Sequence, residues 1–174
     1  MERANFGMMG LGVMGMMLAL NMERNGFHVA GYDLDKSKVE SFGNSYPEKN
    51  LIACNNLTEF LAVLERPRRI MMMVPAGKAV DAAIASIRDL LAPGDLLIDG
   101  GNSFFLDTER RSRELEEKGI IYIGTGVSGG EQGALWGPSI MPGGQKEAWE
   151  LVKPIFEAIS AKVQDEPCVT HIGP

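Results

Sequence analysis

Short apolar runs alternate with longer segments of helical periodicity along most of this chain. The apolar runs show little alternation of polar and apolar positions, which is typical of strands covered on both faces of a parallel sheet. The predicted strands are Phe6–Gly10, His28–Asp33, Arg69–Val74, Asp95–Asp99 and Ile120–Gly124. The predicted helices are Val13–Arg24, Lys36–Phe42, Leu57–Leu64, Lys78–Leu91, Asp107–Lys118 and Lys146–Ile159. This order predicts a doubly wound α/β domain with a mainly parallel sheet and helices on both faces.

Two stretches interrupt the alternation. Gly43–Asn56 contains several turn-forming residues and Gly126–Gly144 is rich in glycine, so both are predicted to be irregular. Later, Ala161–Val163 has the pattern of a short strand, and no polar tail follows before Pro174. Residues 1–174 are therefore predicted to form one domain, in a sequence that is cut at a domain boundary.

The predicted helix Asp107–Lys118 is very polar. Two pairs of opposite charge lie four residues apart in it, Glu109 with Arg113 and Glu114 with Lys118. Such pairs form on the solvent-facing side of a helix, so we expect most of this helix to face water.

Length and charge exclude several classes of protein. The chain has 174 residues, of which 45% are hydrophobic and 23% charged, as in an ordinary globular domain. With 17 Lys and Arg against 23 Asp and Glu, the net charge of -6 argues against binding to nucleic acid or to an anionic membrane. No run of about 18 apolar residues and no signal peptide is present, so no membrane-spanning segment is expected. Glycine is frequent, at 21 residues, and its clusters are the best leads to function.

The cysteine, histidine and methionine residues give weaker evidence of function than the glycine clusters. Cys54 and Cys168 match neither a zinc-binding nor a Cys-x-x-Cys spacing, so we expect two reduced thiols in a cytoplasmic protein, and no metal. His28 begins a predicted strand and is interpreted as structural, whereas His171 has no assigned role. The three consecutive residues Met71–Met73 are predicted to belong to the core.

The first predicted strand runs into Gly10-Leu11-Gly12-Val13-Met14-Gly15, a Gly-x-Gly-x-x-Gly sequence. Between a strand and a helix, this is the fingerprint of a dinucleotide-binding, Rossmann-like βαβ unit. Gly10 permits a tight turn, Gly12 lets the backbone approach a pyrophosphate, and Gly15 lets helix and strand pack closely. The N–H groups at the helix start then bind the diphosphate without Lys or Arg. A purely structural turn is the alternative.

Asp33 lies at the end of the second predicted strand, 18 residues after Gly15. An acidic residue at this place accepts hydrogen bonds from the ribose hydroxyls of NAD, and it repels the 2′-phosphate of NADP. The nearby cations Lys36 and Lys38 are able to pair with a 2′-phosphate, so NADP remains an alternative coenzyme. A strand-end cap is the structural alternative for Asp33.

Three further clusters follow later strands, where a doubly wound sheet binds its ligands. Val74-Pro75-Ala76-Gly77 has small residues that suit a cofactor surface, and Asp99-Gly100-Gly101-Asn102-Ser103 offers an uncharged amide for hydroxyl groups. Ordinary strand-to-helix loops are the alternative for both. Gly126-Val127-Ser128-Gly129-Gly130-Glu131 is interpreted as a backbone nest for a carboxylate or phosphate.

Several of these motifs together resemble one enzyme family. Gly10–Asn21, Asp99–Ser103 with Asp107-Thr108, and Gly126–Glu131 through Gly137–Gly144 are similar to the decarboxylating 6-phosphogluconate dehydrogenases. The first motif is shared with the wider β-hydroxyacid dehydrogenases, whereas the long block that ends in Gly-Pro-Ser-Ile-Met-Pro-Gly-Gly is more specific. The resemblance covers essentially the whole chain, but only the N-terminal domain of the family.

The resemblance implies an activity and a set of site residues. Enzymes of this family oxidise the 3-hydroxyl of 6-phosphogluconate by hydride transfer to NAD or NADP, and loss of CO2 then gives ribulose 5-phosphate. The implied coenzyme positions are Gly10, Leu11, Gly12, Val13, Met14, Gly15, Asp33, Val74, Pro75, Ala76 and Asn102. The implied substrate positions are Asn102, Ser128, Gly129 and Gly130. A cytoplasmic enzyme that forms a homodimer or larger homo-oligomer is also implied.

Three departures from the family pattern matter. NADP-type members have Asn-Arg-Thr where this chain has Asp33-Leu34-Asp35, which favours NAD, and Pro75 stands where Lys is common. The sequence also ends before the Lys and Glu that act as general base and acid, and before the all-helical domain. No catalytic residue is therefore assigned here, and the 174 residues alone are expected to be inactive. An enzyme for another small β-hydroxyacid and a nucleotide-binding or redox-sensing module without turnover remain as alternatives.

Overall fold

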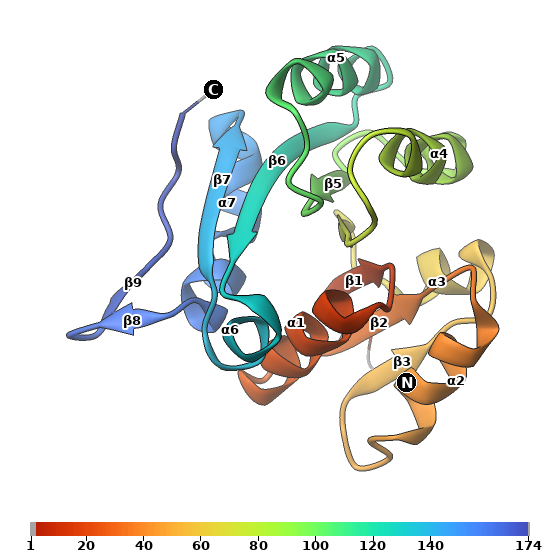
Figure 1. The fold of residues 1–174 in the computed structure, drawn as a ribbon. Coiled ribbons are helices and arrows are strands. Elements are labelled where there is room, and N and C mark those ends of the chain that lie inside the picture. Colours follow the sequence, from red (N-terminus) through yellow and green to blue (C-terminus); the bar gives the residue numbers. More distant parts are fainter. Residues whose placement is uncertain (1–2, 174) are drawn as a thin grey trace.

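A seven-stranded sheet forms the centre of the protein, in a computed structural model that describes residues 3–173 (Figure 1). Its strand order is β3-β2-β1-β4-β5-β6-β7. The strands are β1 (Phe6–Met9), β2 (Val29–Tyr32), β3 (Leu51–Ala53), β4 (Arg69–Met72), β5 (Leu96–Asp99), β6 (Ile121–Ser128) and β7 (Ser139–Gly144). Neighbouring strands from β3 to β6 are parallel, and β7 is antiparallel to β6. The chain winds outward from β1 in both directions, which confirms the predicted doubly wound fold.

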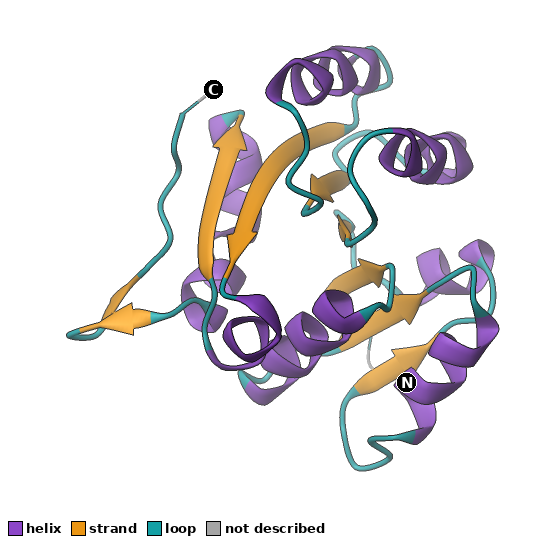
Figure 2. Cartoon of the chain, viewed as in Figure 1, coloured by secondary structure: helices purple, strands orange, loops and turns teal. Residues whose placement is uncertain are grey.

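Helices cover both faces of this sheet, and Figure 2 shows the strands in the middle with helices around them. The helices are α1 (Val13–Arg24), α2 (Lys36–Asn44), α3 (Leu57–Val63), α4 (Lys78–Ile87), α5 (Phe105–Glu116), α6 (Gly130–Trp136) and α7 (Lys146–Ile159), with a 3₁₀ turn η1 (Arg88–Leu90) after α4. Each face holds one apolar core: α1, α2 and α7 contribute to the first, and α3, α4 and α5 to the second.

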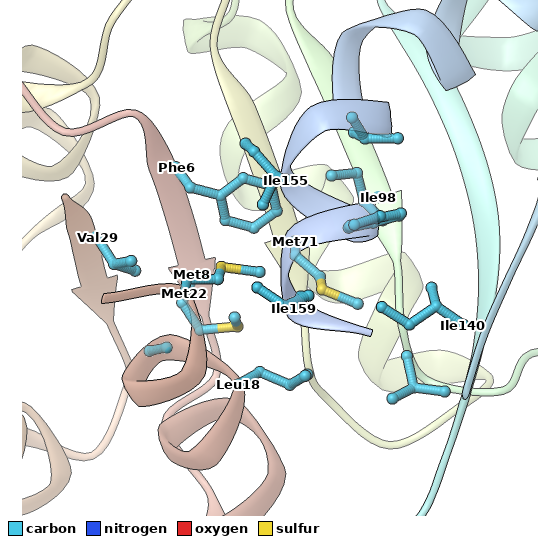
Figure 3. Close-up of a cluster of buried hydrophobic side chains, with 14 of the residues drawn as sticks. Phe6, Met8, Leu18, Met22, Val29, Met71, Ile98, Ile140, Ile155 and Ile159 are labelled. Atoms are coloured by element: carbon cyan, nitrogen blue, oxygen red, sulfur yellow. The ribbon is translucent and has the colours of Figure 1, made fainter. Parts of the chain in front are cut away.

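Successive residues of a strand enter different cores, because side chains alternate between the faces of a sheet. Met8 and Met71 belong to the first core, whereas Met9 and Met72 belong to the second. Figure 3 shows part of the first core, to which Met8, Met71 and Leu18 of α1 all belong. This double burial explains why the strands carry unbroken apolar runs. It confirms the prediction for Met71 and Met72, and Met73 packs half-buried against the first core.

Two segments predicted to be irregular contain regular structure. The first, residues 43–56, holds β3 at the sheet edge. The second, residues 126–144, begins inside β6, forms α6 and returns as β7. That prediction was wrong because Gly126 and the Gly143-Gly144 pair weaken the strand signal, although cross-strand pairing still holds both glycine segments in the sheet.

Most residues of the predicted polar helix 107–118 are exposed or half-buried, as expected, but one side of α5 differs from the prediction. Arg111 and Leu115 are buried, so one side of the helix packs inside the protein. The ion pairs differ as well: Arg110 contacts Glu114, and Lys118 contacts Asp89. A single buried arginine therefore lies in a helix whose composition predicts exposure.

The C-terminal segment runs along β7. Lys162–Val163 (β8) pairs with Glu166–Pro167 (β9) in a small separate sheet. Beyond it, the Ile172 N–H donates to the Pro142 carbonyl at 2.9 Å, and the His171 ring Nε2 lies 2.6 Å from the Gly144 carbonyl oxygen. His171 thus holds this segment against the sheet edge.

Both cysteines are free, as predicted, and within residues 3–173 no helix is long and apolar enough to cross a membrane.

Candidate functional site

The three glycines of the first turn have different structural roles. Gly10 has a φ of +99°, and a Cβ at this position would overlap the Met73 carbonyl oxygen. A Cβ on Gly15 would overlap the Gly10 carbonyl oxygen, so packing requires both glycines. Gly12 has an ordinary φ of -66°, and apart from its two chain neighbours no atom of residues 3–173 lies within 4 Å of a Cβ built there. The protein itself does not require glycine at position 12, and the open space in front of it can receive a ligand.

Helix α1 begins directly behind this open space. The Met16 N–H donates to the Gly12 carbonyl at 2.9 Å, which is the first bond of the helix. The N–H groups of Val13, Met14 and Gly15 precede that bond and have no acceptor within the helix. The first turn carries no acidic side chain, so the positive end of the helix dipole is not neutralised locally. This arrangement binds anions.

Asp33 lies beside the same turn, directly after β2. Its Oδ2 accepts the Leu11 N–H at 2.7 Å, and its Oδ1 accepts the Asp35 N–H at 2.8 Å. The Lys38 ammonium lies 3.8 Å from Oδ2. A carboxylate has about four lone-pair positions, so the two backbone bonds leave acceptor capacity for a further ligand. The residue therefore holds the glycine-rich turn and still offers a carboxylate next to the anion site, while the Leu11 amide is already bonded.

The loops after β4 and β5 meet at the same edge of the sheet. A Cβ on Gly101 would lie 2.7 Å from the Val74 carbonyl oxygen, so the two backbones are in close contact. Val74 also lies near the first turn, since its Cγ1 is 3.1 Å from a Cβ built on Gly10. Asn102 adopts a φ of +54°, and its Oδ1 accepts the Val127 N–H at 3.3 Å. Asn102 thus bonds to β6 one residue before Ser128.

The predicted nest is only partly present. Gly126, Val127 and Ser128 belong to β6, Gly129 caps α6 and Gly130 begins it, and these last two glycines have φ values of +138° and +61°. Ser128 is exposed at the end of its strand. The junction of β6 and α6 therefore presents Ser128, Gly129 and Gly130 at the edge of the sheet that also carries Asn102.

A cavity of about 810 Å³ opens on the α5 side of β6 and β7. Asn102, Gly126 and Met141 are among the residues that line it, whereas the glycine-rich turn and Ser128 are not. The cavity therefore lies next to the candidate site, and Asn102 belongs to both.

The sequence interpretation missed a buried charged network next to these loops. Asp99 is fully buried and accepts hydrogen bonds from the Tyr122 hydroxyl at 2.8 Å and from Arg111 at 3.2 Å. Burial and the Asp99 carboxylate raise the pKa of Tyr122, so its hydroxyl keeps the proton that it donates. Hydrogen bonds from Arg111 and Arg110 lower the pKa of Asp81 to about 2. In the sequence, the local feature that could have indicated this network is the pair Arg110-Arg111 in an otherwise polar helix.

Domains with this strand order, and with an open glycine-rich turn at the start of the first helix, bind dinucleotides. The present chain is a domain of this Rossmann class. The model of the NAD binding domain of 6-phosphogluconate dehydrogenase matches residues 5–173. The chain belongs to that family.

Similar proteins agree with this assignment. The NADP-dependent, decarboxylating 6-phosphogluconate dehydrogenase of Bacillus subtilis (strain 168) is 57% identical over 174 residues, which are 100% of this chain and 37% of that protein. The decarboxylating enzyme of Escherichia coli (strain K12) is 53% identical over 99% of the chain and 37% of its own length. The chain thus spans about a third of the length of these curated relatives.

Solved structures give the same result for the fold. The 6-phosphogluconate dehydrogenase of Plasmodium falciparum, described as apo form and as complexes with NADP+ and with 6-phosphogluconate, superposes with a TM-score of 0.92. It is 40% identical, over 98% of this chain and 37% of that one. A 3-hydroxyisobutyrate dehydrogenase of Mycobacterium tuberculosis has a TM-score of 0.80 at 23% identity, and it shows the fold alone.

Proposed function

We propose that this chain is the coenzyme-binding part of an enzyme that oxidises 6-phosphogluconate with NAD or NADP and releases CO2 to form ribulose 5-phosphate. The open space at Gly12, in front of the N-terminus of α1, carries the coenzyme part of the proposal. The identity of more than half of the residues to decarboxylating 6-phosphogluconate dehydrogenases, over the whole chain, supports the reaction and the substrate.

The residues divide into two groups in this proposal. The backbone N–H groups at the start of α1 bind the pyrophosphate, and Asp33 accepts the adenosine ribose hydroxyls. The nicotinamide would be held by Val13, Met14, Val74, Pro75 and Ala76, and it would supply the acceptor for the hydride. Asn102 lies between coenzyme and substrate, and Ser128, Gly129 and Gly130 bind the sugar acid.

The general base and the general acid belong, in our proposal, to a part of the enzyme outside these residues. A base must remove the proton of the 3-hydroxyl, and an acid must protonate the enediol that follows loss of CO2. The resemblance implies that none of the family's acid and base positions falls on residues 1–174. The whole enzyme is proposed to be a cytoplasmic homodimer or larger homo-oligomer on the resemblance alone.

The coenzyme preference follows from Asp33. Two negative charges about 4 Å apart repel by about 4 kcal/mol at an effective dielectric constant of about 20. The 2′-phosphate of NADP meets this repulsion, whereas the hydroxyls of NAD donate to the carboxylate. Lys38, 3.8 Å from Asp33, offsets part of the repulsion. We therefore expect NAD to bind about ten- to a hundredfold more tightly than NADP, which corresponds to about 1.4–2.7 kcal/mol.

Calorimetric titration of the chain with NAD+ and NADP+ tests both parts of the proposal. The double variant Asp33→Asn, Leu34→Arg is expected to reverse the order, because it removes the repulsion and places a guanidinium at an exposed position. Glu40→Gln is the matched control, since it removes one negative charge at an exposed position of α2 outside the Asp33-Leu34-Asp35 triplet and should leave the order unchanged.

Two results would contradict the proposal. Equal or tighter binding of NADP by the unchanged chain would refute the role of Asp33. Reduction of coenzyme by 6-phosphogluconate with the 174 residues alone, at the rate of an ordinary dehydrogenase, would refute the assignment of acid and base to another part of the enzyme.

A further inference from the structure

Arg111 of α5 is a charged residue with 1% of its surface exposed. All three nitrogens of its guanidinium group are bonded. Nε lies 2.8 Å from Asp81 Oδ1, Nη1 lies 3.2 Å from Asp99 Oδ2 and 3.1 Å from Ser103 Oγ, and Nη2 lies 3.0 Å from the Gly77 carbonyl oxygen. A buried guanidinium is stable only when it is paired and hydrogen-bonded, and these four acceptors meet that condition.

Three of the four acceptors lie in, or directly next to, two different loops, and the fourth, Asp81, lies in α4. Gly77 is the last residue before α4, in the loop that carries Val74 and Ala76. Asp99 and Ser103 enclose the loop that carries Asn102. The guanidinium therefore joins, from inside the protein, the two loops that the proposed function places beside the nicotinamide.

The loop after β5 needs such a restraint. Asn102 is held at a positive φ, a conformation that is uncommon for residues other than glycine and that costs less for Asn than for most of them. Asp99 restrains the start of the loop by accepting the Gly101 N–H at 3.0 Å. Arg111 bonds both to Asp99 and to Ser103, so it fixes the loop on either side of Asn102.

We propose that Arg111 is a positioning residue for the nicotinamide half of the coenzyme site. It acts through its bonds to the Gly77 carbonyl and to the side chains of Asp99 and Ser103. These bonds set the place of Asn102, Val74 and Ala76. It has no contact with the turn at Gly12 or with Asp33 among the hydrogen bonds of the described residues. This inference rests on the proposed function.

The test compares NADH with ADP-ribose, which has the same pyrophosphate and adenosine but lacks the nicotinamide. Arg111→Met is expected to weaken NADH binding by about tenfold and to leave ADP-ribose binding within about twofold of the wild type. A variant that only loosened the fold would weaken both ligands. Calorimetry gives both affinities, and circular dichroism checks that the variant is folded.

Arg110→Met is the matched control. Arg110 is the neighbouring arginine and also bonds to Asp81, at 2.9 Å, but its hydrogen bonds go to neither loop. It should leave both affinities unchanged. If Arg111→Met does not fold, Ser103→Ala removes one of the acceptors with little change in burial, and it should weaken NADH alone by about threefold.

The outcomes separate the two proposals. A wild-type chain that binds neither NADH nor ADP-ribose overturns the proposed function, and the role of Arg111 with it. A wild-type chain that binds both ligands, together with variants that weaken both equally or neither, leaves the coenzyme function standing and overturns the positioning role. Selective loss of NADH affinity supports it.

Discussion

Gly12→Val separates the binding function of the first turn from its structural function. Gly12 has a φ of -66°, and in the described part of the chain a Cβ there meets no atom within 4 Å beyond its sequence neighbours. The valine side chain therefore fits the protein but occupies the space in which the pyrophosphate is proposed to lie. We expect the variant to fold normally and to lose coenzyme binding.

The loss of coenzyme binding and the change in stability each have an expected magnitude. A lost hydrogen bond to a charged group costs about 1.5–3 kcal/mol, so displacement of a phosphate from two helix N–H groups costs about 3 kcal/mol or more. That corresponds to at least about a hundredfold weaker binding. The free energy of unfolding should change by less than about 1 kcal/mol, because a small loss of N-cap preference is offset by the lower entropy of the unfolded chain.

Calorimetry with NAD+ and urea unfolding measure the two effects. Gly15→Ala is the contrasting variant: its Cβ overlaps the Gly10 carbonyl oxygen, so it should lower the free energy of unfolding by about 1–3 kcal/mol. Unchanged NAD affinity in Gly12→Val would show that the turn is only structural and would refute the reasoning. A large loss of stability in Gly12→Val would refute the geometry.

Two further predictions concern buried groups away from the coenzyme site. The fully buried Asn21 amide donates to the Ala134 and Ile159 carbonyls at 3.0 and 2.9 Å. Asn21→Leu should therefore lower the free energy of unfolding, measured by urea unfolding, by about 2–4 kcal/mol. A loss below about 1 kcal/mol would contradict this prediction. Burial, with a smaller effect of Glu59, raises the pKa of the Cys54 thiol to about 12, so at pH 8 only the half-buried Cys168 should react rapidly with a disulfide reagent. One fast thiol that disappears in Cys168→Ser is expected, and two fast thiols in the native protein would be the contrary result.

Much of the fold could be predicted from the sequence because its signals are local. The bounds of α1 and α7 agree with the prediction at both ends. In α1 an apolar pattern is stopped by Asn25-Gly26, and in α7 an amphipathic pattern buries six residues of one face. The strand β7 could not be predicted, because Pro142 and two glycines remove its local preference for a strand. Its pairing with the long strand β6 gives it that structure instead.

The candidate site likewise has features that the sequence predicts and contacts that only the structure shows. The sequence by itself determined the glycine-rich turn, the acidic residue after β2 and the parallel sheet, because each depends on neighbouring residues or on simple alternation. Only the tertiary structure decided that Asp33 bonds to Leu11, that Asn102 bonds to Val127, and that Arg111 is buried between two loops. These contacts join residues 8 to 34 positions apart in the chain. Composition and periodicity describe each segment separately, whereas a hydrogen bond between distant segments exists only after packing of the sheet has brought their backbones together.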